Sequence, residues 1–172
     1  MKSFLKKSGF TLIELIVVVA IIAILAAATL VAVNPARRVG NAQNAQRWTD
    51  INAIADAWSA YLADNNSTPP TTTNAESTTL ENTTYAISTS TEAINGGTHS
   101  NAHCTGVTTT QAMLNLKALV TGGYVGKIPH DPSYTYAGNN DHTKYYLFWS
   151  SNGTVTVGAC TTYNSAVIKV TR

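Results

Sequence analysis

Charged side chains are scarce in this sequence of 172 residues, in which Asp, Glu, Lys and Arg together make up 12%. An ordinary globular protein has about 25%. The formal net charge is +2, so the composition lacks the basic excess of a dedicated nucleic-acid-binding protein. Chains kept disordered by charge combine low hydrophobicity with high net charge. Because 44% of the residues are hydrophobic, the sequence does not belong to that class either.

Cysteine and catalytic motifs are also scarce. The chain has two cysteines, too few for a disulfide-dense miniprotein or for a zinc site with four cysteine ligands. The sequence contains no Gly-x-Ser-x-Gly motif and no glycine-rich loop of the kind that binds phosphate. We therefore expect a protein that is not an enzyme and that needs no cofactor.

Apolar residues, by contrast, are concentrated near the N-terminus. Residues 10–33 form an apolar run of 24 residues in which Glu14 is the one charged residue. As a helix this run is about 36 Å long, enough to cross a hydrocarbon layer of about 30 Å. Lys2, Lys6 and Lys7 precede it and favour a cytoplasmic N-terminus. The sequence therefore predicts one membrane-spanning helix with its N-terminus inside.

Two general interpretations of this segment are a single-pass membrane anchor and a cleaved secretory signal peptide. The small residues 26–28 would suit signal-peptide cleavage, but the run exceeds the usual apolar length of about 7–15 residues. Glu14 fits neither interpretation well, since a carboxylate at the centre of a spanning helix costs roughly 2.5–3.5 kcal/mol. We expect Glu14 to have a function and a partner.

Residues 6–15, Lys-Lys-Ser-Gly-Phe-Thr-Leu-Ile-Glu-Leu, resemble the class III signal of type IV pilins and type II secretion pseudopilins. The resemblance implies that a prepilin peptidase cuts after Gly9 and that Phe10 becomes the N-methylated first residue. It also implies that Glu14 neutralises the N-terminal amine of a neighbouring subunit during assembly. Beyond the first 35 residues, the chain is similar to this family only in its general layout.

The second part of the long helix is predicted to be amphipathic. Pro35 interrupts the helix, because proline has no amide to donate, and a kink or a locally unwound stretch is expected there. Up to about residue 65, apolar residues then recur at helical spacing. They are Ala42, Ala45, Trp48, Ile51, Ile54, Ala55, Trp58, Tyr61 and Leu62. We expect Trp48 and Trp58 to belong to the core, with Arg47 and Asp50 between the apolar positions.

The expected fold class is α+β, in which a long N-terminal helix packs on a small C-terminal antiparallel sheet, as in the ladle shape of pilins. The chain divides into a leader (1–9), a transmembrane and assembly half of the helix (10–33), an amphipathic half (34–65) and a globular head (66–172). Within the head we expect a Thr-rich loop (66–110), a short helix (111–121) and an antiparallel sheet of three or four strands (133–171). Residues 85–87 could be a strand or a turn, and Asn152-Gly153 predicts a hairpin.

Cys104 and Cys160 lie beyond the membrane span, in an oxidising compartment if the N-terminus is inside. A disulfide between them would close a loop of about 56 residues and contribute roughly 4 kcal/mol in the chain-entropy model. It would fasten the Thr-rich loop to the sheet. Two free thiols and intermolecular pairing remain alternatives.

Metal sites have little support in the sequence. His99, His103 and Cys104 suggest zinc, but their segment does not look helical and a disulfide would remove the cysteine ligand. Asp131 and Asp141 are candidate calcium ligands, although the ordered acidic spacing of a calcium loop is missing. Ordinary turn chemistry is the alternative for these residues.

The sequence therefore predicts a structural subunit, a pilin, that polymerises into a type IV pilus-like extracellular filament serving adhesion, motility or DNA uptake. A pseudopilin of a type II secretion or competence machine is the alternative, and a non-polymerising, membrane-anchored binding protein is a third interpretation. Expected partners are copies of the chain, a prepilin peptidase, the inner-membrane assembly platform with its motor ATPase, and membrane lipid before assembly. The head lacks a Lys or Arg cluster, so no specific nucleic-acid partner is expected. Before assembly the subunit would sit in the cytoplasmic membrane, and afterwards in a cell-surface filament.

Overall fold

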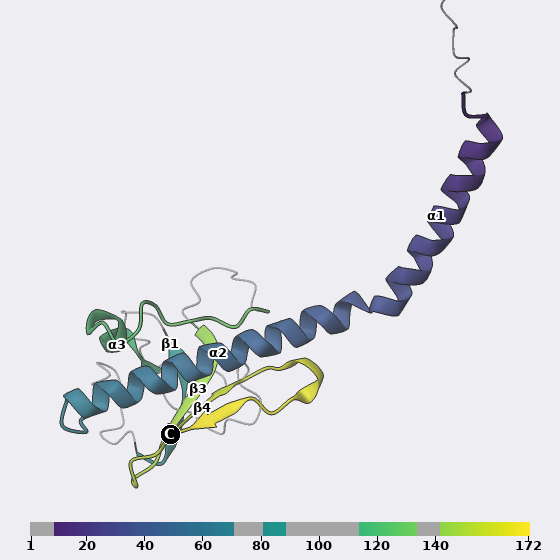
Figure 1. Cartoon of the computed structure of the whole chain (residues 1–172). Helices are drawn as coiled ribbons and strands as arrows, with labels where there is room; N and C mark the ends of the chain where they lie inside the picture. Colours follow the sequence, from purple (N-terminus) through teal and green to yellow (C-terminus); the bar gives the residue numbers. More distant parts are fainter. Residues whose placement is uncertain (1–8, 71–80, 89–113, 134–141) are drawn as a thin grey trace, which may run out of the picture. The chain divides into compact units, whose positions relative to one another are not determined.

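The structure is a computed structural model that describes residues 9–70, 81–88, 114–133 and 142–172 (Figure 1). The chain divides into two compact units, Met1–Val39 and Gly40–Arg172. The first holds an apolar helix and the second holds a helix with a sheet.

Helix α1 (Leu12–Val33) dominates the first unit. None of the stretch Leu12–Leu30 is buried, and it is long and apolar enough to cross a membrane. Large apolar side chains such as Ile13 (69% exposed) and Leu25 (60% exposed) face outward. An apolar surface all round is what a helix in lipid, or in a bundle of apolar helices, requires.

The helical run is interrupted at Asn34, one residue before Pro35. Asn34 adopts a left-handed conformation (φ 43°, ψ 75°) and ends α1. A residue before proline is disfavoured in the right-handed helical region, and asparagine tolerates the left-handed one. Pro35 then opens helix α2 (Pro35–Asp64), at the first helical position, where a missing amide costs nothing. The Asn34 side chain accepts a hydrogen bond from the amide of Arg37 (3.3 Å).

The second unit contains a five-stranded sheet in the order β2-β1-β3-β4-β5. Its strands are β1 (Thr83–Ser88), β2 (Leu114–Asn115), β3 (His142–Trp149), β4 (Val155–Ala159) and β5 (Lys169–Thr171). The α+β class is confirmed. The sheet is mixed rather than purely antiparallel, because β1 pairs with β2 in parallel, while β3 pairs antiparallel with both β1 and β4.

The segment predicted as a short helix at 111–121 folds differently. Helix α3 covers Lys117–Thr121, and Leu114–Asn115 form strand β2 instead. Leu114 pairs with Ile87 of β1, and Leu114 and Leu116 are both buried, with Asn115 less so. That alternation has the period of a strand, which explains why the helix begins later than expected. Residues 111–113 lie outside the described residues.

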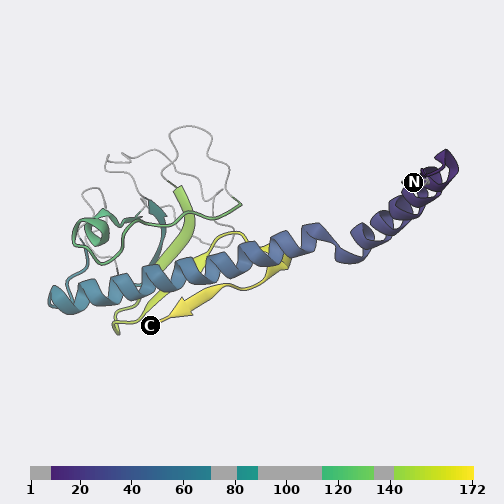
Figure 2. The same cartoon turned by 45° about the horizontal axis from the view of Figure 1, so that its top comes forward.

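Helix α2 lies across one face of the sheet, as Figures 1 and 2 both show. Ile51, Ile54 and Trp58 of α2 are fully buried, together with Tyr145 of β3 and Val157 of β4. Burying side chains of this size contributes roughly 1.5–3 kcal/mol each. This contact is the hydrophobic core that holds the second unit together.

The turn between β3 and β4 is the predicted hairpin. The amides of Ser150 and Gly153 bond to Thr154 O (2.8 Å) and Ser150 O (2.9 Å), respectively. Gly153 has φ +86°, a conformation that glycine adopts without strain. The hairpin fixes the β3–β4 register and places Tyr145 opposite Ala159.

Candidate functional site

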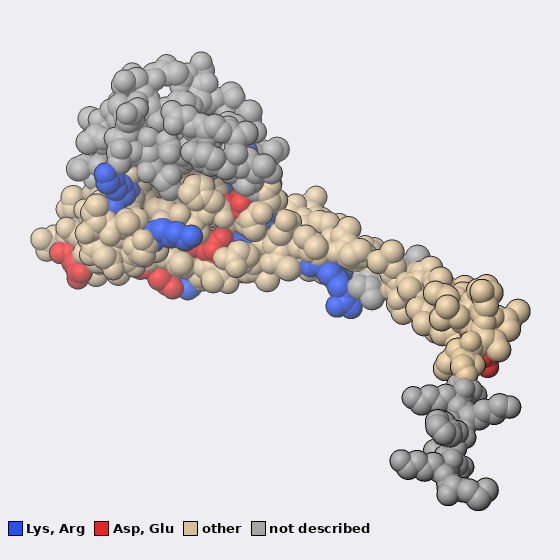
Figure 3. All heavy atoms as spheres, turned by 90° about the horizontal axis from the view of Figure 1, so that it is seen from above, with Lys and Arg blue, Asp and Glu red and all other residues tan. Residues whose placement is uncertain are grey.

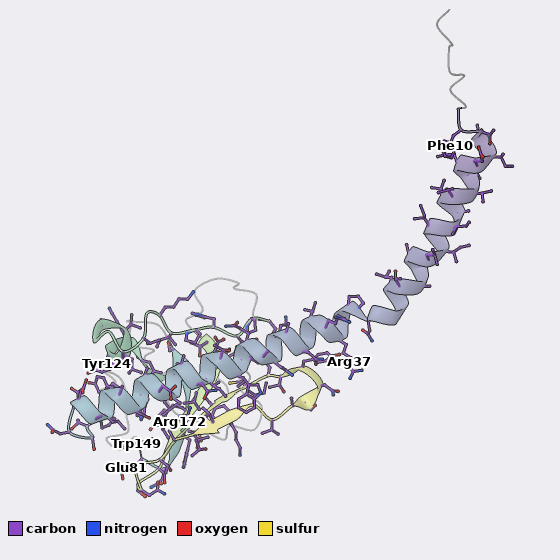
Figure 4. All side chains as sticks on the ribbon, in the orientation of Figure 1. Phe10, Arg37, Glu81, Tyr124, Trp149 and Arg172 are labelled. Atoms are coloured by element: carbon purple, nitrogen blue, oxygen red, sulfur yellow. The ribbon has the colours of Figure 1, made fainter. Side chains whose placement is uncertain are left out.

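The first candidate site is the start of α1. Phe10 is 87% exposed and precedes the helix (Figure 4). Gly9 is also exposed and outside the helix, and nothing lies within 4 Å of the position a Cβ would take there. The peptide bond between these residues is therefore accessible to an enzyme.

Thr11 and Glu14 form a reciprocal cap at this helix start. The Thr11 amide and hydroxyl each donate to Glu14 Oε2 (2.8 Å for both), and the Glu14 amide donates to Thr11 Oγ1 (3.3 Å). This is a capping box, which satisfies backbone amides that a helix start leaves without partners. Our sequence reasoning missed the role of Thr11, although the Thr-x-x-Glu spacing before an apolar run predicts it.

Glu14 has no basic partner among the described residues, where the ion pairs Arg47–Asp131 and Arg172–Asp56 join other side chains. Its carboxylate is the one charge on an otherwise apolar helix. A charge in apolar surroundings is costly unless a second charge and further hydrogen bonds compensate it. The start of α1 can therefore receive a positive group from outside the chain.

The surface beyond this cap is uncharged. Figure 3 shows no acidic or basic side chain on the visible face of α1 between its first turn and the basic groups at the start of α2, where Figure 4 labels Arg37. Monomeric soluble proteins rarely expose contiguous apolar patches larger than a few hundred Å². An uncharged apolar surface of this extent suits a helix that is covered by lipid or by other apolar helices.

The second cluster lies between helix α2 and the head, and it contains the two charged residues of α2 that the sequence analysis placed between apolar positions. Arg47 of α2 binds Asp131 through Nε–Oδ2 (2.6 Å) and Nη2–Oδ1 (2.8 Å), and both side chains are buried. Asp50 accepts hydrogen bonds from the hydroxyl of Tyr145 (2.7 Å) and from Gln46 (2.7 Å). The amphipathic pattern placed Arg47 and Asp50 between the apolar positions, yet both side chains are buried, because Asp131 and Tyr145 on the sheet side pair with them.

Trp48 also differs from its expected position. Its side chain is 43% exposed, whereas Trp58 is fully buried and meets the Trp149 ring edge to face at 6.3 Å. Ala42 and Ala45 are exposed as well. The buried stripe of α2 is therefore rotated from the predicted one toward Arg47 and Asp50.

The Arg47–Asp131 pair determines what Asp131 can do. Burial by itself raises the pKa of Asp131, but hydrogen bonds from Arg47 and Ser133 outweigh burial and lower that pKa below its ordinary value. The pKa of Arg47 is raised, chiefly by the hydrogen bond to Asp131. Both carboxylate oxygens of Asp131 therefore accept hydrogen bonds from side chains or amides of Arg47 and Ser133, and the structure gives no support to Asp131 as a calcium ligand.

Several predicted residues lie outside the described residues, namely Cys104, Asp141, His99 and His103. Cys160 directly follows β4, and its amide bonds to Lys144 O (3.0 Å). The disulfide with Cys104 stays a prediction, as does calcium binding at Asp141. Within the described part of the chain, no group of three His, Cys, Asp or Glu side chains is placed to hold a metal ion.

Comparison with known proteins identifies the N-terminal segment. Residues 5–30 match the family model of the prokaryotic N-terminal methylation motif. This motif is the class III prepilin signal of type IV pilins and pseudopilins. No curated protein and no solved structure matches the chain.

Proposed function

Starting from the class III prepilin signal that the chain carries, we propose that the protein is a pilin, a structural subunit that polymerises into a type IV pilus-like extracellular filament. Adhesion, motility and DNA uptake are the functions such a filament would serve. The observation that supports the proposal most is the methylation motif at residues 5–30, which overlaps an apolar helix that is not buried anywhere over Leu12–Leu30.

Maturation would come first. A prepilin peptidase cuts after Gly9, and the new N-terminal residue, Phe10, is methylated. The exposure of both residues, ahead of the helix, suits access by an enzyme. Before assembly, α1 lies in the cytoplasmic membrane with the N-terminus inside, and the head is outside.

Assembly would then replace lipid by other subunits. The apolar surface of α1 packs against α1 of neighbouring copies, and Glu14 pairs with the amine of Phe10 on a neighbour. The carboxylate carries a charge without a basic partner among the described residues, and the cleaved amine is a positive charge at the same end of the helix. Pairing between subunits leaves neither charge alone in the apolar centre of the filament.

The alternative is a pseudopilin of a type II secretion or competence machine, since the methylation motif occurs in both classes. A membrane-anchored binding protein that does not polymerise is the remaining interpretation. The hydroxyl-rich head sequence and its two cysteines favour a filament exposed outside the cell.

Mass spectrometry of the mature chain tests the proposal. We expect an N-terminus of N-methylated Phe10 in filaments sheared from the cell surface. A mature chain that begins at Thr29 would instead indicate ordinary signal-peptide cleavage and would contradict the proposal.

Deleting the gene separates the two family interpretations, pilin and pseudopilin. Loss of long surface filaments with normal secretion indicates a pilin, and loss of secretion in cells without long filaments indicates a pseudopilin.

A further inference from the structure

The connection between β4 and β5 is a tight hairpin whose turn is held by its own hydrogen bonds. Thr162 Oγ1 donates to Ala166 O (2.7 Å), and the Ala166 amide donates to Tyr163 O (3.4 Å). Residues 164 and 165, at the turn, have positive φ angles (56° and 52°), as in the tight turns that join antiparallel strands. We call residues 162–167 the hairpin tip.

The hairpin tip exposes apolar side chains. Val167 is 76% exposed, more than any other large apolar side chain described in the second unit. The next residue, Ile168, is buried in the core, so the alternation of side chains along an extended chain directs Val167 outward. Tyr163 is 36% exposed. Its side chain combines an apolar ring with a hydroxyl, which suits a boundary between apolar and aqueous surroundings.

The hairpin tip is fastened to α2 where that helix enters the second unit. Asn44 Nδ2 donates to Tyr163 O (3.0 Å), and the Tyr163 amide donates to Asn44 Oδ1 (3.0 Å). A Cβ built at Gly40 would collide with the Tyr163 ring, so the ring rests directly against the helix backbone there. Figures 1 and 2 both show the yellow loop between β4 and β5 beside α2. Because Gly40 is the first residue of the second unit, the tip lies at the end of the head that follows α1 along the chain.

The segments that form this end of the head contain no acidic residue. Residues 35–49 of α2 include three arginines and no Asp or Glu, and residues 160–168 have no charged side chain. Arg47 is buried in its ion pair, whereas Arg37 and Arg38 are exposed. Guanidinium groups bind phosphate oxygens well. The charge at this end therefore suits a surface of phosphate-bearing lipid headgroups.

The length of the chain keeps the hairpin tip close to any membrane that α1 crosses. Gly40, which the tip contacts, follows the last residue of α1, Val33, by seven positions. Such a segment spans about 10 Å as a helix and at most about 23 Å when fully extended. This bound holds for any orientation of the two units. The headgroup layer on each side of a bilayer is about 5–8 Å thick, so the tip is within reach of it.

We propose that the hairpin tip docks into the headgroup layer of the membrane that α1 crosses, with Val167 and Tyr163 as the side chains that enter it. Tyrosine is enriched at membrane–water interfaces, where its ring lies at the level of the headgroups. The exposed guanidinium of Arg37 would bind a lipid phosphate nearby. Docking would limit the orientations of the head before assembly. The inference requires α1 to span a membrane, but it does not require the subunits to polymerise.

Photocrosslinking of the full chain in vesicles of phosphatidylglycerol and phosphatidylcholine tests this inference. The probe is p-benzoylphenylalanine in place of Ala166, an exposed residue of the hairpin tip, and mass spectrometry identifies what it captures. The matched control carries the probe in place of Ser151, which is exposed in the turn at the other end of β4. We expect the probe at Ala166 to capture lipid about tenfold more often, which corresponds to about 1.4 kcal/mol. Equal capture at the two positions would overturn the proposal.

A pair of charge substitutions tests the side chain that enters the lipid. With the probe at Ala166, Val167→Asp should reduce lipid capture about tenfold, because it replaces an apolar side chain by a charge that anionic headgroups repel. Ser151→Asp adds the same charge at the other turn and should leave lipid capture at Ala166 unchanged. Equal capture in the two variants would contradict the role of Val167.

A probe at Val19 of α1 separates failure of this inference from failure of the proposed function. Val19 is exposed on the apolar helix and should capture lipid whenever α1 lies in the membrane. Capture at Val19 with none at Ala166 would reject docking of the tip and leave the proposed function standing. Absence of capture at both positions would contradict the membrane span on which both depend. Capture of a second copy of the chain at Ala166, in place of lipid, would also overturn the inference.

Discussion

Arg47 and Asp131 form a buried, two-bond ion pair that joins helix α2 to the segment before strand β3. The pair spans 84 residues of sequence. Ser133 Oγ accepts a further bond from Arg47 (2.8 Å), and the Asp131 amide bonds to Thr143 O (2.9 Å). The head is therefore positioned on the helix by polar contacts as well as by its apolar core.

Removing one member of this pair should destabilise the head strongly. In Asp131→Ala, the guanidinium of Arg47 stays buried without its partner, which typically costs about 3–5 kcal/mol. Urea unfolding of the full chain in detergent micelles, followed by tryptophan fluorescence, to which buried Trp58 contributes, measures the change.

The control for this experiment is Asp56→Ala. Asp56 pairs with Arg172 (3.0 Å) at the surface, where both side chains are well exposed. Such pairs contribute about 1 kcal/mol or less. An equal decrease in the free energy of unfolding in the two variants would show that the Arg47–Asp131 pair stabilises the fold no more than a surface pair does.

The same pair should make the free energy of unfolding depend on pH in the acidic range. The pKa of Asp131 is lower in the folded chain than in an unfolded one. Its contribution is therefore fully present above the unfolded pKa, about 3.9, and is lost as the pH falls from there through the folded pKa. We expect the free energy of unfolding to fall below about pH 4, and to fall less steeply in Asp131→Asn. Parallel pH profiles for wild type and variant would contradict this assignment.

Gly40→Ala should destabilise the contact between α2 and Tyr163. The added methyl group would collide with the ring, and overpacking of this kind costs about 1–3 kcal/mol. Thermal unfolding of the full chain is a suitable measurement. Gly126→Ala is the control, because nothing lies within 4 Å of the position of its Cβ. A Gly40→Ala variant as stable as the control would show that the ring moves aside freely.

Glu14→Ala should leave cleavage after Gly9 intact and should abolish or strongly reduce surface filaments. The reason is that the amine of Phe10 on a neighbouring subunit would lose its counter-charge. Immunoblotting reports processing, and electron microscopy of sheared surface material reports filaments. Normal piliation in this variant would refute charge pairing.

Glu14→Gln separates the charge from the helix cap. Its amide oxygen can still accept hydrogen bonds from Thr11, as Oε2 of Glu14 does, but it carries no charge. We expect this variant to lack filaments too. If glutamine restored them, capping of α1 rather than charge would explain the need for residue 14.

Local features of the sequence predicted much of this structure. The apolar run at residues 10–33 predicted the exposed helix, and Asn152-Gly153 predicted the β3–β4 hairpin, because each signal lies within a few consecutive residues. The burial of Arg47 and Asp50 could not be predicted in this way. Their partners Asp131 and Tyr145 lie 84 and 95 residues away, and a helical pattern assigns charged residues to the exposed side by default.

Strand β2 was missed for a similar reason. It is two residues long, and what makes it a strand is its pairing with Ile87 of β1. The contact of Tyr163 with Gly40 could not be predicted from the sequence either, since nothing in the sequence near either residue indicates that the other is its neighbour. For the N-terminal site, the Thr11–Glu14 spacing was a usable signal that we did not exploit.

The two edges of the described sheet are its shortest strands, β2 with two residues and β5 with three. Long, flat edges invite strands of other chains to add and so lead to aggregation. Lys169, exposed on β5, adds a charge of the kind that discourages such pairing. In the proposed filament, where heads would be crowded together, short and charged edges of this kind would discourage the heads from joining edge to edge.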